Sequence, residues 1–397
     1  MTDSKAKPLA PESLAAQALG WVDEATRAVV PPIHLATTYL RDPDNQYRSG
    51  RVYSRADSPN YDQPEQLLAK LEGGAAAMVF SSGMSAATAC FLALAPGDHV
   101  IAPKVMYWSL RNWLLNFATH WGLVVEFVDA DSVDAVRAAV RPGKTRMIWL
   151  ETPANPLWCV SDIAACARIA HDAGALLAVD STCATPVFTR PIEHGADLVM
   201  HAATKYLAGH SDVIAGALVA AHDDDHWKRI RLIRAQLGTV LGALESYLLL
   251  RGMRTLFPRV RTAADNARWL AERLAAHPLV EAVLYPGLPG FAGHEVAGRQ
   301  MAGGFGGMMS IRVKGDPALD LTGEAAAIAV AAQVGLWKRA TSLGGVESLI
   351  EHRASVEGAG TPAPADLLRL SVGIEAKEDL FDDLDRALSL AHRRNAG

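Results

Sequence analysis

Cysteine is scarce in this chain, and the few that occur are not arranged as a metal site or a disulfide framework. None of the four belongs to a Cys-x-x-Cys pair. The N-terminal stretch MTDSKAKPLAPESLAAQ also lacks the apolar core of a secretory signal. We therefore expect reduced, mostly buried thiols in a cytoplasmic protein, at Cys90, Cys159, Cys166 and Cys183.

Long apolar runs and an excess of one charge are lacking as well. No uncharged apolar run reaches the ~18 residues of a membrane-spanning helix, so no membrane partner is predicted. With 38 basic and 43 acidic residues the net charge is −5, which argues against a dedicated nucleic-acid binder. The sequence has neither a GxxxxGK[ST] motif nor a GxGxxG after a strand, which disfavours P-loop and dinucleotide-binding proteins.

What the sequence does contain is an alternation of short apolar runs with helical patterns of 3.6-residue period, such as Asp162–Ala173. Half of the residues are hydrophobic, which excludes a disordered chain. The pattern predicts an α/β domain with a mainly parallel sheet that is covered on both faces. The apolar runs are Ala76–Phe80, His99–Ala102, Val124–Val128, Met147–Glu151, Leu176–Asp180, Leu198–His201 and Val213–Val219.

The 397 residues suggest two or three domains at about 150 residues each. We expect an irregular N-terminal arm over residues 1–60, a large domain over 61–250 and a smaller α+β domain over 251–397. The segments that support the last part are two helical patterns, two strand-like runs and an Ala/Gly/Pro-rich loop: Tyr247–Phe257, Arg261–Ala276, Gly307–Val313, Leu367–Val372 and Ala354–Ala365.

Polar residues follow several apolar runs, at the sheet edge where α/β proteins bind ligands. Ser81-Ser-Gly-Met84 opens a predicted helix, whose backbone N–H groups suit a phosphate. Asp180 ends a buried run and needs a helix N-terminus, a metal or a protonated ring nitrogen as its partner. Lys205 follows the next run, where burial would lower its pKa. Taken singly, each has an ordinary structural explanation.

Their combination is more specific than its members. A phosphate cradle, a strand-end aspartate and a lysine 25 residues later are the parts that hold pyridoxal phosphate. The surrounding motifs resemble the trans-sulfuration, or Cys/Met-metabolism, family of pyridoxal-phosphate enzymes, of the cystathionine γ-synthase and γ-lyase kind. The motifs are Tyr53-Ser-Arg55, Leu71-Glu-Gly-Gly74, Ser81-Ser-Gly-Met84, Glu151-Thr-Pro-Ala-Asn-Pro156, Val179-Asp-Ser-Thr182, Ala203-Thr-Lys-Tyr206, Gly304-Phe-Gly-Gly-Met308, Ser342-Leu-Gly-Gly-Val-Glu-Ser348 and Leu368-Arg-Leu-Ser-Val-Gly-Ile-Glu375.

The resemblance implies a fold-type I transferase, with a large seven-stranded domain, a smaller C-terminal α+β domain and no metal. It also implies roles around the cofactor. Lys205 would hold pyridoxal phosphate and move protons, Asp180 would pair with the ring nitrogen, and Tyr107 would stack on the ring. The residues implied in binding the rest of the cofactor are Gly83, Met84, Thr182 and Thr204.

The same resemblance implies a substrate site and a second subunit. Asn155, Ser342 and Arg369 would hold the carboxylate of a small amino-acid substrate. Tyr53 and Arg55 would reach the cofactor of a neighbouring subunit, so the active unit would be at least a homodimer and is expected to be a homotetramer. Tyr107 and Tyr53 are the predicted proton donors to the leaving group.

Four positions depart from the family pattern or refine it. Ala202 replaces the usual serine three residues before the lysine, which removes one phosphate ligand. Val52 and Thr341 replace acids that would face the distal ammonium of cystathionine, so this substrate is disfavoured. Leu343, rather than tryptophan, favours chemistry at the γ-carbon.

The predicted function is therefore a lyase that cleaves a carbon–heteroatom bond at the γ- or β-carbon of an amino acid. The alternatives left open are a cystathionine β-lyase or γ-synthase, replacement as in O-acylhomoserine sulfhydrylases, a canavanine-type γ-lyase, and an aminotransferase. A cofactor-binding protein without activity is the non-enzymatic alternative, and the intact lysine, Tyr107 and Arg369 speak against it.

Overall fold

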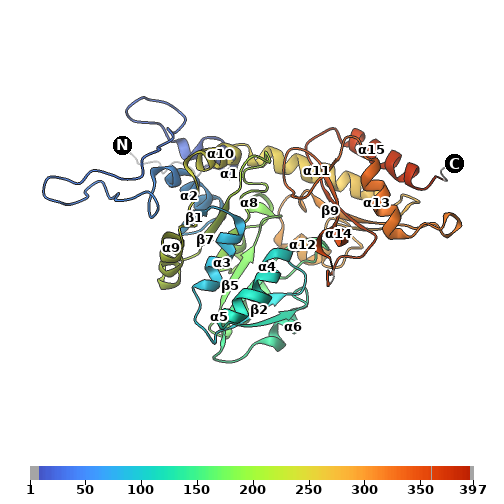
Figure 1. Cartoon of the computed structure of the whole chain (residues 1–397), viewed down its shortest axis with the longest axis horizontal. Helices are drawn as coiled ribbons and strands as arrows, with labels where there is room; N and C mark the ends of the chain where they lie inside the picture. The colour runs from blue at the N-terminus through green and yellow to red at the C-terminus, as the bar shows by residue number, and fades with distance from the viewer. Residues whose placement is uncertain (1–8, 359, 394–397) are drawn as a thin grey trace, which may run out of the picture.

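The computed structural model describes residues 9–358 and 360–393, and two β-sheets organise them (Figure 1). The larger sheet has seven strands in the order β1-β7-β6-β5-β4-β2-β3. Only β7 runs antiparallel to its neighbours β1 and β6, so the predicted mainly parallel sheet is confirmed. The strands are β1 Ala76–Phe80, β2 His99–Pro103, β3 Val124–Val128, β4 Thr145–Glu151, β5 Leu176–Asp180, β6 Leu198–His201 and β7 Gly216–Ala220.

Each predicted apolar run forms a strand, and the seventh begins later than predicted. The run over Val213–Val219 enters the sheet only at Gly216. The preceding residue, Ala215, is bonded to Thr204 instead, because its N–H donates to the Thr204 hydroxyl and its carbonyl accepts from it. This exchange ties β7 to the loop that carries Lys205.

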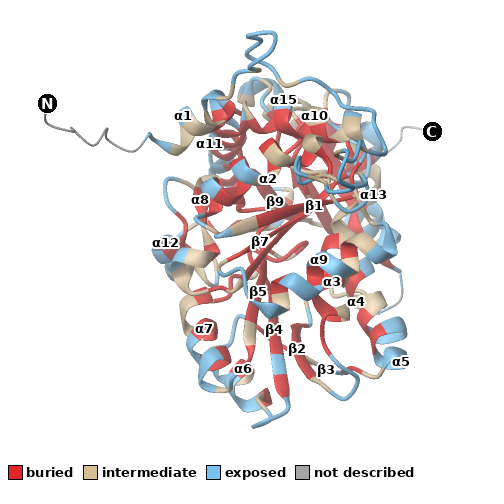
Figure 2. Ribbon diagram, turned by 90° about the vertical axis from the view of Figure 1, so that its left-hand side faces the viewer, coloured by how far each residue is buried: buried red, intermediate tan, exposed pale blue. Residues whose placement is uncertain are grey.

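Both faces of the large sheet are covered, which explains why its strands are continuously apolar. In β4, Trp149 packs with α3 (Gly83–Leu92) and α4 (Trp108–Trp113) on one face. Its neighbours Ile148 and Leu150 pack with α6 (Val133–Ala139) and α7 (Ile163–Asp172) on the other. Figure 2 shows most of the strands buried beneath helices whose outer surfaces are exposed, whereas the edge strand β3 is only partly buried.

The second sheet has five strands in the order β10-β11-β12-β9-β8, and packs against helices α11, α13 and α15. The long helix α11 joins the two parts of the molecule, since Val260 lies in the core of the large sheet and Leu270 in that of the second sheet. The elements are β8 Val280–Leu284, β9 Met308–Val313, β10 Lys338–Arg339, β11 Leu349–His352, β12 Leu367–Ser371, α11 Leu256–Leu274, α13 Gly323–Gln333 and α15 Lys377–Ala391.

Two predictions about the C-terminal segment are wrong in detail. The stretch predicted as a loop over Ala354–Ala365 begins inside a short helix, α14, at Arg353–Glu357. Arg353 and Glu357, the first and last residues of α14, lie one helical turn apart and form an ion pair. The Ala/Gly/Pro-rich composition of the stretch does not reveal this pairing. The helix predicted over Tyr247–Phe257 is interrupted, because α10 (Ala243–Met253) ends before α11 begins. The predicted division into residues 1–60, 61–250 and 251–397 stays a prediction.

The described part of the N-terminal arm is mostly irregular and extends away from the body (Figure 1). After α1 (Pro11–Ala16) it has little regular structure until α2 (Pro59–Glu72), which Ser58 caps by accepting the N–H of Asn60. Leu35 and Leu40 are 82% and 94% exposed. Residues 1–8 of the predicted arm lie outside the described residues. Among the helices described, none is long and apolar enough to cross a membrane.

Candidate active site

A cavity of about 300 Å³ opens at the carboxyl ends of β4, β5 and β6, between the two sheets. The site residues predicted from sequence line it together, except Tyr53 and Arg55. Its walls are therefore built by both parts of the chain, although the residues lie far apart in sequence. The predicted residues that meet there are Gly83, Met84, Tyr107, Asn155, Asp180, Thr182, Thr204, Lys205, Ser342 and Arg369.

The first part of the cavity is the N-terminus of α3. Ser82 caps this helix by accepting the N–H of Ser85. The N–H groups of Gly83 and Met84 have no acceptor among residues 9–358 and 360–393. A Cβ at Gly83 would lie 2.8 Å from the Cβ of Ala202, so this position must be glycine to keep the turn against the strand-end loop. Two free amides at a helix N-terminus suit a phosphate group.

Asp180 ends β5 with one carboxylate oxygen committed and the other available. Its Oδ1 accepts from the backbone N–H and the hydroxyl of Thr182, at 3.0 and 2.5 Å. No donor in the described part of the chain engages Oδ2. Burial raises the pKa of Asp180, and the bonds from Thr182 oppose that rise. A cation in the cavity would therefore be stabilised by this carboxylate.

Lys205 reaches the cavity from the loop after β6. Its Nζ donates to the Ser342 hydroxyl over 2.7 Å. Burial, together with the charge of Arg369, lowers the pKa of Lys205 to about 8. The strand before it is held to α2 by the buried pair of His201 and Glu72, whose Nε2 and Oε1 lie 2.6 Å apart. Such a lysine is neutral in a far larger fraction near pH 8 than an ordinary lysine.

Arg369, on β12, is the centre of a group of acceptors on the opposite wall. Its Nη1 donates to the Asn155 side-chain oxygen over 3.2 Å, and its Nη2 donates to the Ser342 carbonyl over 2.7 Å. Burial and the neighbouring Arg353 lower the pKa of Arg369 to about 10, so the guanidinium stays charged at neutral pH. This arrangement suits the carboxylate of a small ligand.

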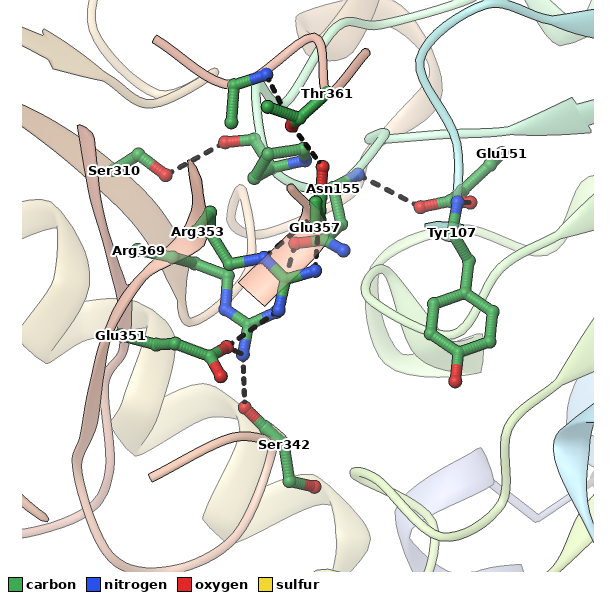
Figure 3. A network of polar contacts seen from close by, with 12 residues as sticks. Tyr107, Glu151, Asn155, Ser310, Ser342, Glu351, Arg353, Glu357, Thr361 and Arg369 are labelled. Atoms are coloured by element: carbon green, nitrogen blue, oxygen red, sulfur yellow. Dashed lines mark hydrogen bonds and ion pairs between the residues drawn. The ribbon is translucent and has the colours of Figure 1, made fainter. Parts of the chain in front are cut away.

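Several contacts of the site were not foreseen from the sequence. Glu151, at the end of β4, accepts the backbone N–H of Tyr107 at 2.6 Å and that of Asn155 at 2.9 Å, so one buried carboxylate fixes two loops (Figure 3). Burial and the nearby Asp180 raise the pKa of Glu151. Glu351 also pairs with Arg369 and with Arg353. The sequence signal that could have pointed to these two residues is the pair of charges that follows the apolar Leu349-Ile350.

Three residues predicted to bind the cofactor have other partners or positions within their own chain. The Thr204 hydroxyl is engaged with the backbone of Ala215. Tyr53 is 47% exposed on the arm, and Arg55 donates to the carbonyl of Ala235 over 2.7 Å. Neither arm residue lines the cavity of its own chain.

A family model described as the Cys/Met metabolism PLP-dependent enzyme matches residues 12–389. This chain belongs to that family. Pyridoxal phosphate is therefore its cofactor, and the protein is a PLP-dependent enzyme of the trans-sulfuration family. The predicted fold class is confirmed by the same match and by similar solved structures.

The relatives are named for reactions of cystathionine. The cystathionine gamma-synthase of Mycobacterium tuberculosis is 44% identical over 373 residues, covering 92% of this chain and 93% of the relative. The cystathionine gamma-lyase of Sus scrofa is 38% identical over 381 residues, covering 94% and 91%. A structure of cystathionine gamma synthase from Xanthomonas oryzae pv. oryzae, in complex with aminoacrylate and cysteine, has a TM-score of 0.90 at 36% identity, covering 97% of this chain and 99% of that one.

The residues present fit the cofactor. Among the described residues the amides of Gly83 and Met84 have no acceptor and suit its phosphate. Oδ2 of Asp180, which accepts from no donor in the same part of the chain, suits its protonated ring nitrogen, and Lys205 supplies the amine. All three features line one cavity. The fit depends on burial as well as on residue type. A buried carboxylate such as Asp180 is stabilised by a cationic partner, and a buried amine such as Lys205 is more readily neutral and able to react.

Proposed function

We propose that this enzyme acts at the γ-carbon of a small amino acid, eliminating or replacing a heteroatom group. One observation in the structure carries the part of the proposal that concerns an α-amino acid. Ser342 accepts from the Lys205 amine through its hydroxyl and from the Arg369 guanidinium through its carbonyl, at 2.7 Å in both cases. The proton-transferring amine and the proposed carboxylate site are thus held against a single residue, as an α-amino acid requires.

In this proposal Asp180, the α3 amides and Lys205 bind the cofactor, with Thr182 orienting Asp180 and Thr204 shaping the Lys205 loop. When bound, pyridoxal phosphate supplies an electron sink for the carbanion formed at the substrate. Tyr107, whose backbone N–H is held by Glu151, would cover the ring of the bound cofactor. Arg369, with Asn155 and Ser342, would orient the substrate carboxylate.

Proton transfers are assigned to residues of the chain. Lys205, with a pKa of about 8, would remove the proton from Cα. Only after the amine has given up this proton and is neutral again could it take the second proton, which leaves Cβ. Tyr107, or Tyr53 of a neighbouring subunit, donates a proton to the departing heteroatom. Each tyrosine is a weak acid that stabilises the leaving group as charge develops on it.

The relatives' names support chemistry at the γ-carbon and make cystathionine a candidate substrate. The cavity within one chain disfavours a second ammonium group, because its lining includes Leu110, Ile214, Thr341 and Leu343. Its two acidic residues already accept hydrogen bonds, Glu151 from the backbone of Tyr107 and Asn155 and Asp180 from Thr182. A second cation would lack a carboxylate partner of its own. We therefore propose uncharged or weakly charged γ-substituents as the preferred class.

A substrate panel tests this function. We expect homoserine esters and γ-thioethers to give an oxo acid and ammonia, or a new amino acid when a thiol is added, with cystathionine slower by roughly tenfold or more. Products are identified by mass spectrometry. Matched β-substituted amino acids are the controls, and faster turnover of these would contradict the γ-carbon assignment. Accumulation of pyridoxamine phosphate would instead identify an aminotransferase.

We also propose a homodimer as the smallest active unit, a homotetramer as the assembled form and a cytoplasmic location. The proposal of a dimer is supported by the exposed apolar arm and by the position of Tyr53 and Arg55 outside their own cavity. The location is supported by the four cysteines, which are free in the structure. Three of them are buried, as expected.

Complementation between inactive variants tests the shared site. Lys205→Ala and Arg55→Ala chains, co-expressed, should regain activity, because a mixed dimer contains one site with both native residues. Random assembly gives such sites at about a quarter of the total. The matched control co-expresses Lys205→Ala with Arg369→Leu, whose two residues lie in one cavity, and it should stay inactive. Equal, negligible activity in both mixtures would rule out a contribution from the partner's arm.

A further inference from the structure

Two guanidinium groups share one carboxylate oxygen in the wall of the active-site cavity. Arg369 Nη2 and Arg353 Nη1 lie 2.6 and 2.7 Å from Oε2 of Glu351. Both arginines line the cavity, and Figure 3 shows their planar groups close together. The predicted carboxylate-binding arginine is therefore already engaged by a carboxylate of its own chain, and that carboxylate is held by a second arginine.

The row of charges continues away from the cavity. Arg353 also donates from Nη2 and Nε to Oε1 of Glu357, at 2.5 and 3.2 Å. Thr361 donates its hydroxyl to the other oxygen of Glu357. All four charged side chains are more than nine-tenths buried. Two positive and two negative charges thus balance in a region where an unpaired charge would be costly.

Local structure fixes the row. Glu351 on β11 stands directly opposite Arg369 on β12 in the antiparallel register, so the two side chains emerge on the same face of the sheet. The chain then turns into α14, where Arg353 and Glu357 are four residues apart and pair along the helix. Glu351, near the end of β11, and Arg353, at the start of α14, are only two positions apart, so no flexible segment separates the Arg369–Glu351 pair from the Arg353–Glu357 pair.

The arrangement has a consequence for substrate binding. If Glu351 had Arg369 as its only partner, it would compete fully with a substrate carboxylate for the same guanidinium. Arg353 divides the interaction, since it binds the same oxygen of Glu351 from the other side. Its charge also acts on Arg369, whose pKa burial and Arg353 together lower.

We propose that Arg353 is a positioning residue: it shares the carboxylate of Glu351 and so leaves the Arg369 guanidinium available to the α-carboxylate of the substrate. This inference rests on the proposed carboxylate role of Arg369. Arg353 does not contact the reacting atoms in this proposal. Its effect should therefore fall on the binding of substrates that carry a carboxylate, and not on proton transfer.

The test begins with Arg353→Met, which removes the charge and keeps the length of the side chain. KM for the preferred amino acid should rise roughly tenfold, while kcat stays within about threefold of the native enzyme. Binding of the corresponding amine without the carboxylate, followed by the spectrum of the bound cofactor, should not change. The matched control is Arg312→Met, which breaks the ion pair with Asp366 away from the cavity and should leave KM unchanged.

Two double variants separate positioning from net charge. Arg353→Met with Glu351→Gln removes the competing carboxylate, and KM should return to within about threefold of the native value. Arg353→Met with Glu357→Gln restores the same net charge but leaves Glu351 on Arg369, so KM should stay high. Equal recovery in both double variants would show that only net charge matters, which overturns the proposal.

Folding and the role of Arg369 are tested separately. Thermal unfolding of each variant shows whether it is folded. If Arg353→Met does not fold, Arg353→Lys is used in its place, because lysine cannot bridge Glu351 and Glu357 as arginine does. An unchanged KM, or a loss in kcat alone, in a folded variant contradicts the positioning role. Arg369→Lys is the reference, since an unchanged KM there would refute the proposed carboxylate site itself and not only its support.

Discussion

Replacing Lys205 by alanine should abolish both the visible absorbance of the lysine-bound cofactor and turnover. The structure places no other lysine on the lining of the described cavity, and the Lys205 amine is held there by Ser342. We expect turnover to fall by at least about 1,000-fold, because both the covalent anchor and the group that moves protons are lost. The absorption spectrum and a keto-acid assay measure the two effects.

The matched control for this variant is Lys104→Ala. Lys104 is an exposed lysine paired with Asp129 at the surface, and its replacement should leave spectrum and turnover unchanged. Substantial turnover by Lys205→Ala, under conditions in which the protein is folded, would remove Lys205 from its proposed role. A loss of absorbance without a loss of turnover would separate anchoring from proton transfer.

The lowered pKa of Lys205 adds a pH dependence to this prediction. The amine attacks only when it is neutral, and burial places its pKa at about 8 instead of the usual 10.5. Covalent uptake of pyridoxal phosphate by the cofactor-free protein should therefore accelerate as pH rises through about 8 and level off above it. A rate that continues to climb toward pH 10 would contradict the effect of burial.

Replacing Asp180 by asparagine should produce the second largest loss. Asparagine keeps the shape and can still accept from Thr182, but it removes the charge that favours a protonated ring nitrogen. Loss of a charged hydrogen bond worth about 3 kcal/mol corresponds to roughly a 100-fold fall in turnover. Steady-state kinetics at saturating cofactor measure the fall, and equilibrium dialysis measures the expected weaker binding of the cofactor.

Thr182→Val provides a graded comparison for Asp180. Valine removes the hydroxyl that donates to Asp180 and accepts the N–H of Ala202, while the carboxylate charge remains. We expect a loss of about tenfold in turnover, smaller than that of Asp180→Asn. If Asp180→Asn kept native turnover with the cofactor fully bound, another group would have to stabilise the ring nitrogen.

Much of the large sheet and of the cofactor site could be predicted because their signals are local. Buried parallel strands leave continuous apolar runs, and β1 and β5 have the predicted bounds. The residues proposed to bind the cofactor stand at or just after the ends of those runs, as with Gly83 after β1 and Asp180 at the end of β5. Motifs a few residues long were therefore enough to place the lysine, the aspartate and the phosphate cradle.

The strand order is a different matter, since it depends on contacts between distant segments. Nothing in the apolar run at β7 says that it inserts between β1 and β6 and runs against both. The exchange of hydrogen bonds between Thr204 and Ala215 is likewise a product of that insertion. It occupied a hydroxyl that the sequence assigned to the cofactor.

By itself, the sequence determined the α/β class, and its short motifs, through the family that they resemble, predicted the cofactor and the residues proposed to bind it. Only the tertiary structure decided what supports them. Glu151 reaches the backbone of Tyr107 across 44 positions, and Glu351 meets Arg369 through the register of β11 with β12. Such pairings arise from the folding of strands into one sheet and the burial of opposite charges together, and these are properties of the assembled chain.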